Sequence, residues 1–220
     1  MRRPSRLRRW LANAVGVTSL GLSIAVARTA SASDDDGAYG RLDGDVLLIA
    51  EAGAAYVDGA AGLALGGRIL YLSTAGFYAR YIEVFSQEGV AAPRQLGGGV
   101  ELRPLFVARF GQDWERGPPR LDLFLDSFAI DVGTFWWSPP HRDIDVLPGL
   151  EVAASLEFPF TETGWGPRIG LTGSYRLSQG DAGVRGRPDL DARASSVLFQ
   201  LSWHGIVDFG LIDVGDALVR

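Results

Sequence analysis

The sequence predicts an all-β protein that closes into an eight-stranded antiparallel transmembrane barrel. Apolar and polar residues alternate with a period of two along several segments, as in strands whose two faces meet different surroundings. Clusters of glycine, proline and aspartate separate these segments, and the 220 residues include 29 glycines and 11 prolines. Aromatic residues lie mostly near the expected strand ends. Together these observations indicate short strands joined by turns.

The first 32 residues differ chemically from the rest of the chain. A basic head precedes the small and apolar stretch Leu11 to Ala27, and Ala30-Ser31-Ala32 provides the small residues that signal peptidase requires. We therefore expect residues 1–32 to be a secretory signal peptide. Polar and glycine residues within the stretch disfavour a transmembrane helix. Arg8-Arg9 would also fit twin-arginine export, but we favour the general secretory route because basic heads often contain arginine pairs.

Cleavage after Ala32 would change the charge of the chain. All 21 basic residues are arginine and six of them lie in the first 32 residues, which leaves 15 arginines against 26 acidic residues. The resulting net charge of −11 disfavours nucleic acid as a partner, because like charges repel. The absence of cysteine excludes a disulfide framework, a thiolate metal site, a cysteine nucleophile and a lipidated cysteine. We expect a flexible acidic leader at 33–44, the barrel at 45–205 and a C-terminal tail at 206–220.

Five segments show the strand alternation directly. In Leu150 to Phe160, for example, Leu156 and Phe158 share one face while Glu151 and Glu157 share the other. The five segments are Val46–Tyr56, Val100–Phe110, Leu150–Phe160, Arg168–Leu177 and Ser196–His204.

Two further segments need an interruption. Leu63 to Phe85 keeps one parity, but a single strand of this length would span roughly 76 Å, so we divide it near Ser73-Thr74. Undivided, it would give seven strands instead of eight. Arg120 to Trp137 changes parity, which predicts a β-bulge at Asp126-Ser127, with a turn there as the alternative. Gly97-Gly98-Gly99 is expected to lead flexibly into the strand that starts at Val100, since no phosphate-binding helix follows it.

The connections between the eight strands differ in length. The third, fifth and seventh are long, the second, fourth and sixth are shorter, and the short first one departs from this pattern. Such asymmetry is expected of transmembrane barrels, with both termini on the side of the short connections. The connections lie near residues 58–61, 73–74, 86–96, 112–119, 138–148, 161–166 and 178–193.

The distribution of charge and aromatic rings favours a membrane barrel over a soluble one. Both charge signs lie on the polar faces, where they could neutralise each other inside a narrow barrel, and the rings lie near strand ends, where membrane interfaces attract them. We expect a lumen ion-pair network of Glu51, Arg68, Arg80, Glu101, Arg103, Arg109, Glu151, Glu157, Arg168 and Arg176. We expect membrane-interface aromatics at Tyr56, Tyr71, Tyr81, Phe110, Phe158, Tyr175 and Trp203.

The signal peptide, alternating strands and aromatic strand ends make the chain similar to the small outer-membrane β-barrels of Gram-negative bacteria. The resemblance covers about Asp45 to His204 and is architectural, without a family-specific motif. It implies a location in the outer membrane, with outer-membrane lipid and the barrel-assembly machinery as partners. It does not identify a partner for the extracellular loops. The chain departs from the class at its end, because many such barrels finish on an aromatic residue whereas this one finishes at Val219-Arg220.

No catalytic motif is evident. Ser202 and His204, with Glu151 or Glu157 on other inward faces, are the candidates for a lipid-hydrolysing set, but their spacing matches no motif and their side chains fall on the inward face. We expect no cofactor and no metal. The function that follows is a structural, adhesive or interaction role in the outer membrane. The alternatives are a lipid-modifying barrel enzyme and a soluble periplasmic β-barrel binding protein.

Overall fold

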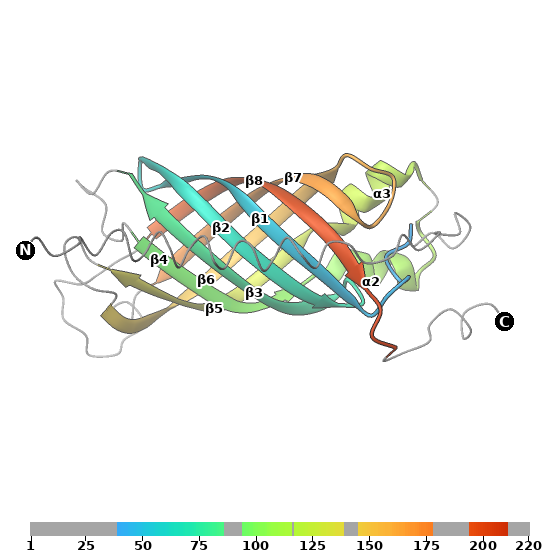
Figure 1. Ribbon diagram of the computed structural model, residues 1–220, viewed down its shortest axis with the longest axis horizontal. Helices are drawn as coiled ribbons and strands as arrows, with labels where there is room; N and C mark the ends of the chain where they lie inside the picture. Colours follow the sequence, from blue (N-terminus) through green and yellow to red (C-terminus); the bar gives the residue numbers. More distant parts are fainter. Residues whose placement is uncertain (1–38, 86–93, 116, 139–144, 178–193, 211–220) are drawn as a thin grey trace, which may run out of the picture. The chain divides into compact units, whose positions relative to one another are not determined.

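Eight antiparallel strands form a closed barrel (Figure 1), which confirms the predicted fold class. The structure, a computed structural model, describes residues 39–85, 94–115, 117–138, 145–177 and 194–210. Each strand pairs with its neighbours in chain order, and β1 also pairs with β8 along its whole length. The strands are β1 (Val46–Val57), β2 (Ala60–Tyr71), β3 (Ala75–Val84), β4 (Arg94–Leu102), β5 (Ala129–Ser138), β6 (Asp145–Pro159), β7 (Gly166–Leu177) and β8 (Ala194–Val207).

Two tight turns separate the first three strands. Asp58 and Gly59 have φ angles of 47° and 92°, as a two-residue hairpin between right-twisted strands requires. Leu72 and Ser73 also have positive φ angles, and the Thr74 backbone N–H donates to the Tyr71 carbonyl at 3.0 Å. An extended strand cannot continue through this geometry, so the predicted division near Ser73-Thr74 is confirmed.

A helix replaces the second half of one predicted strand. Helix α2 (Pro104–Gly111) follows β4, so the expectation of a strand over Val100–Phe110 is wrong beyond Leu102. Pro104 occupies the first helical turn, where its fixed φ and missing N–H are tolerated. The same stretch also carries a helical period, since Phe106 and Phe110 lie one turn apart and their ring centroids are 5.7 Å apart.

A helix also explains the change of parity between Leu125 and Phe128. Helix α3 (Pro119–Asp126) precedes β5, so the predicted bulge at Asp126-Ser127 is wrong. The fourth connection therefore runs from residue 103 to 128 and contains both helices, against the expectation of a short link. The Gly97–Gly99 run lies within β4 and does not lead into it, because β4 begins at Arg94. No helix among the residues that the structure describes is long and apolar enough to span a membrane.

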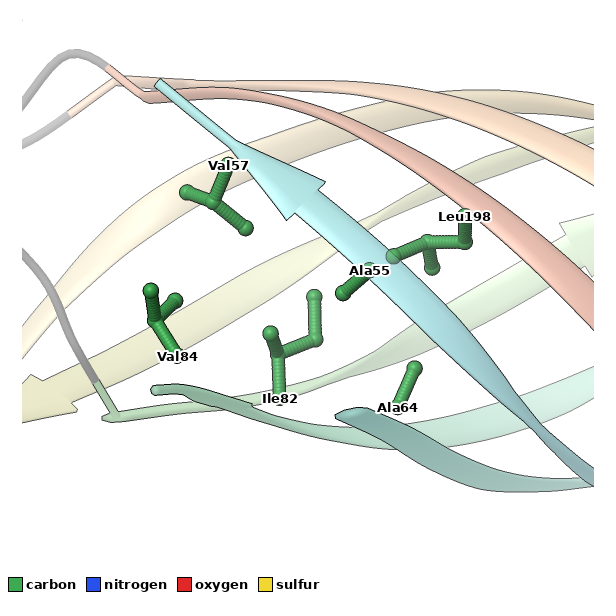
Figure 2. Packing of buried hydrophobic residues seen from close by; sticks show 6 residues of the cluster. All are labelled: Ala55, Val57, Ala64, Ile82, Val84 and Leu198. Carbon is green, nitrogen blue, oxygen red and sulfur yellow. The ribbon is translucent and has the colours of Figure 1, made fainter. Parts of the chain in front are cut away.

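The two ends of the barrel are built differently. At the cap end, where β1 begins and β8 ends, α2 and α3 lie beside the strand ends (Figure 1). At the opposite loop end, six inward side chains form an apolar cluster (Figure 2), comprising Ala55, Val57, Ala64, Ile82, Val84 and Leu198. Between the two ends the inward face is mainly polar. Residues 1–38 and 211–220, with most of the expected signal, leader and tail, lie outside the described residues.

Candidate functional site

Ten charged side chains line the middle and the cap end of the lumen. Strand alternation turns nine of them inward, the tenth, Arg103, follows the end of β4, and each is at most 5% exposed. Five are carboxylates and five are guanidinium groups, so their formal charges cancel. They are Glu51, Glu101, Asp131, Glu151, Glu157, Arg68, Arg80, Arg103, Arg168 and Arg176.

One part of this network centres on Arg80. Its guanidinium lies 3.1 Å from Asp131, 3.2 Å from Glu151 and 3.6 Å from Glu51. Glu151 also pairs with Arg176 and accepts a hydrogen bond from the Tyr78 hydroxyl at 3.3 Å. Because Arg80 lies on β3 and Glu151 on β6, which are not neighbouring strands, this pair crosses the lumen.

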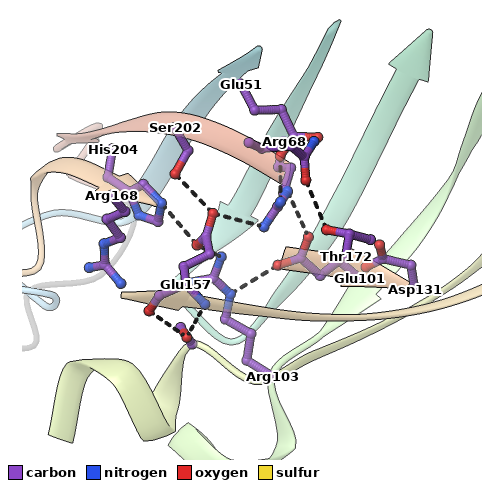
Figure 3. Close-up of polar contacts among 12 residues, drawn as sticks. Glu51, Arg68, Glu101, Arg103, Asp131, Glu157, Arg168, Thr172, Ser202 and His204 are labelled. Atoms are coloured by element: carbon purple, nitrogen blue, oxygen red, sulfur yellow. Dashed lines mark hydrogen bonds and ion pairs between the residues drawn. The ribbon is translucent and has the colours of Figure 1, made fainter. Parts of the chain in front are cut away.

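The other part centres on Glu157 (Figure 3). Its carboxylate lies 3.5 Å from Arg68 and 3.6 Å from Arg103. Arg68 also pairs with Glu51 and lies 3.4 Å from Glu101, which joins this part to Arg80 through Glu51. The result is one continuous network of nine of these side chains along the lumen. The tenth, Arg168, donates a hydrogen bond to the Gly164 carbonyl at 2.9 Å. Charges taken out of water need this degree of pairing, because an unpaired buried charge carries a large desolvation cost.

Glycines on neighbouring strands make room for the large inward side chains. Gly66 pairs with both Glu51 and Arg80, and a Cβ atom at Gly66 would lie 2.3 Å from the Glu51 carboxylate. A Cβ atom at Gly133 would lie 2.7 Å from the Tyr78 hydroxyl. Sequence analysis missed this role, although the glycine-rich strand segments were the available signal.

The expected catalytic pair is not arranged as a nucleophile and its base. The Ser202 hydroxyl donates to Glu157 at 2.9 Å, and His204 Nε2 lies 3.0 Å from the other oxygen of the same carboxylate. Ser202 is 5% exposed and His204 is fully buried, so neither faces the outer surface of the barrel. Within the described ranges, no group of three or more histidine or acidic residues is arranged to hold a metal ion.

A second ion-pair cluster closes the cap end, and sequence analysis missed most of it. Arg41 pairs with Glu115 and with Asp126 at 2.8 Å, and its guanidinium lies 4.2 Å from the centre of the Phe106 ring. Arg41 belongs to the segment expected to be a loose leader, where an arginine among acidic residues gave no signal of burial. Burial, reinforced by a hydrogen bond with Asp126, raises the pKa of Glu115 to about 8.

Arg109 belongs to this cluster instead of the lumen. The expectation that it lies on an inward strand face is wrong, because it lies on α2. There it pairs with Asp122 and, at 2.8 Å, with Asp126, both on α3. The Tyr39 hydroxyl donates to Asp122 at 2.7 Å, which joins the start of the described chain to the same cluster.

The outward strand faces carry most of the expected interface aromatics. Tyr81 is partly buried and its hydroxyl donates to Glu83 at 3.1 Å. Phe110 lies on α2 against Phe106, so its expected place on a strand is wrong. Of the seven expected rings, those that are exposed on the outward face are Tyr56, Tyr71, Phe158, Tyr175 and Trp203.

Comparisons with known proteins give structural neighbours only. No protein-family model and no curated protein matches the chain. One similar solved structure is Ail, the attachment invasion locus protein of Yersinia pestis, in complex with the heparin analogue sucrose octasulfate. Its sequence is 11% identical and the TM-score is 0.35, with 73% of this chain and 97% of that chain covered. Another is the outer membrane protein OprG from Pseudomonas aeruginosa, 10% identical with a TM-score of 0.36, over 74% of this chain and 97% of that one.

Proposed function

We propose that the mature chain is an integral protein of the bacterial outer membrane, with a barrel that anchors it without conducting ions. We further propose a structural, adhesive or interaction role, carried by the connections at the loop end. The observation that carries this proposal is the inverted polarity of the barrel, in which ten charged side chains are buried in the lumen and large apolar side chains are exposed on the outward face of every strand.

The outward face is too apolar for water. Leu65, Phe77 and Leu201 are 51%, 69% and 59% exposed, and they come from three different strands. Outward positions of the same kind occur on every strand, and together they form a continuous belt, which we call the apolar belt. A soluble barrel would bury these side chains and expose the arginines and carboxylates. A hydrocarbon environment reverses that preference, because it solvates the apolar belt and leaves the charges to pair in the lumen.

The filled lumen supports an anchor instead of a pore. An eight-stranded barrel has an interior just wide enough for side chains. Here five guanidinium groups oppose five carboxylates through the middle of the lumen. The apolar cluster around Ile82 and Leu198 fills the loop end, and Arg41 over Phe106 fills part of the cap end.

The connections at the loop end are the part of the chain best suited to an outside partner. The third, fifth and seventh connections, which include residues 86–93, 139–144 and 178–193, all link strands at that end. Residues 1–32 would supply export to the periplasm, and the barrel-assembly machinery would insert the mature chain into outer-membrane lipid.

The test combines location with conductance. The full-length chain is expressed in a Gram-negative host, membranes are fractionated, and unboiled samples are compared with boiled ones by gel electrophoresis. We expect an outer-membrane protein whose folded band shifts on boiling, and no steady conductance after insertion into planar bilayers. A variant with both Arg80 and Glu151 replaced by alanine is the positive control for conductance, because it removes a pair that crosses the lumen.

Two results would overturn the proposal. A mature protein that stays in solution without detergent would establish the soluble periplasmic alternative. Steady conductance by the unaltered protein would show that the lumen is an open channel and that the barrel is not merely an anchor.

A further inference from the structure

The exposed face of α2 is entirely apolar. At about 3.6 residues per turn, its exposed residues fall within one arc of roughly 160°. The opposite face carries the buried Phe106 and the partly buried Arg109 and Phe110. The exposed residues are Pro104, Leu105, Val107, Ala108 and Gly111.

This arrangement is the reverse of the one found in helices that face water. A surface helix of a soluble protein turns its apolar side inward and its charged residues outward. In α2 the only charged residue, Arg109, is turned towards Asp122 and Asp126 of α3, while Leu105 and Val107 are 39% and 54% exposed.

Helix α3 repeats the pattern. Its acidic residues Asp122 and Asp126 are buried, whereas Leu121, on the opposite face, is 50% exposed. On that same face, the Phe124 ring lies 6.1 Å from Phe158, which points outward from β6. The paired charges Arg109, Asp122 and Asp126 therefore face each other, and both helices present apolar side chains to the outside. Arg120 of α3 is also exposed, and its side chain lies 3.6 Å from the exposed Glu162.

These helical faces continue the apolar belt of the barrel. Helix α2 begins two residues after Leu102, the last residue of β4, which points outward and is 52% exposed. Helix α3 meets the apolar belt at Phe158. Trp114, just past the end of α2, is 64% exposed, and tryptophan is enriched where a membrane meets water.

We propose that α2 and α3 lie in the lipid leaflet nearest the cap end, with their apolar faces in contact with acyl chains. The inference rests on the proposed membrane location and deepens it by naming lipid as the occupant of this face. The helices then widen the membrane contact of the barrel at one end, in the manner of amphipathic helices that lie in the interface. Arg41 holds them against the strand ends, through its ion pair with Asp126 of α3 and its contact with the Phe106 ring of α2.

Single-cysteine labelling tests this placement. The chain contains no cysteine, so each cysteine introduced is the one site of labelling. A nitroxide is attached at Val107→Cys on α2, at Val132→Cys in the apolar belt, and at Gln112→Cys just past the helix. Each labelled protein is reconstituted into phosphatidylcholine vesicles, folding is checked by the band shift on boiling, and collisions with oxygen and with a water-soluble nickel chelate are measured.

We expect the label at position 107 to collide several-fold more often with oxygen than with the nickel chelate, as at position 132, and the label at position 112 to show the opposite preference. If position 107 favours the nickel chelate while position 132 favours oxygen, the inference fails and the membrane barrel stands. If both favour the nickel chelate, the proposed function fails as well. If position 107 is shielded from both reagents, a protein surface covers α2 instead of lipid, and the inference is overturned.

Discussion

Glu151 on β6 joins β3 and β7 across the lumen, and replacing it tests how the network is held. It is fully buried, pairs with Arg80 and Arg176, and accepts a hydrogen bond from Tyr78. Methionine at this position keeps most of the side-chain volume and removes the charge. The variant therefore leaves two guanidinium groups short of one carboxylate.

The magnitude follows from the distances. At the 3.2 Å that separates Arg80 from Glu151, a charge pair is worth about 5 kcal/mol at an effective dielectric constant of about 20. Removing Glu151 also removes its own desolvation cost, which offsets much of this loss. Breaking a buried pair by deleting one partner costs about 3–5 kcal/mol net, and we expect Glu151→Met to lower the free energy of unfolding by that amount.

A double-mutant cycle supplies the control. Arg176→Met should cost about as much on its own, while the double variant should cost about 1–3 kcal/mol less than the sum of the two, because neither charge is then left without the other. The free energy of unfolding is measured by urea titration in thin-bilayer vesicles, with tryptophan fluorescence as the signal. Single variants that each cost less than about 1 kcal/mol, or an additive double variant, would show that water screens the lumen charges and would refute the reasoning.

Three further changes test other parts of the structure. Gly133→Ala should destabilise the barrel by about 1–3 kcal/mol, because its Cβ would lie 2.3 Å from the Gly98 carbonyl oxygen, whereas Gly173→Ala, with open space around it, should leave the unfolding midpoint unchanged. Arg41→Ala should speed tryptic cleavage after Arg109 or Arg120 without abolishing the band shift on boiling. The control Arg94→Ala removes an exposed ion pair and should leave the rate of this cleavage unchanged. Equal cleavage rates in the two variants would show that Arg41 does not hold the helices at the cap end. Because the pKa of Glu115 is raised from 4.5 to about 8, its contribution to stability is complete below pH 4.5 and is lost as the pH rises through about 8. The urea midpoint should therefore fall less between pH 5 and pH 9 in Glu115→Gln than in the unaltered protein. An equal fall in both proteins would show that another group causes it.

Strand parity predicted most of the barrel because each buried face repeats every second residue. Over Leu150 to Phe160, for example, the residues that share a face in the sequence also share one in β6. Parity could not predict which arginine meets which carboxylate. The pairing of Arg80 with Glu151 depends on the closure of the barrel and on side chains that cross the lumen, neither of which is a local property of the sequence.

The helical connection escaped the sequence analysis for a physical reason. Over Pro104 to Phe110 the apolar residues satisfy a period of two and also a helical period, and short segments do not separate the two. Pro104 and the Pro118-Pro119 pair were the signals that could have decided it, since proline is favoured in the first turn of a helix and disfavoured inside a sheet. Gly97 to Gly99 hid the start of β4, because glycine contributes no side chain to an alternating pattern.

The most direct test of the central claim is which methyl groups touch lipid. In lipid nanodiscs, nuclear Overhauser effects between methyl groups of the protein and acyl-chain methylenes report contact within a few ångströms. We expect such effects for the outward Leu65, Leu171 and Leu201, and none for the inward Leu70, Ile82 and Leu198. The reverse pattern, or no acyl contact for either set, would contradict a barrel that turns its apolar face to the membrane and its charges to the lumen.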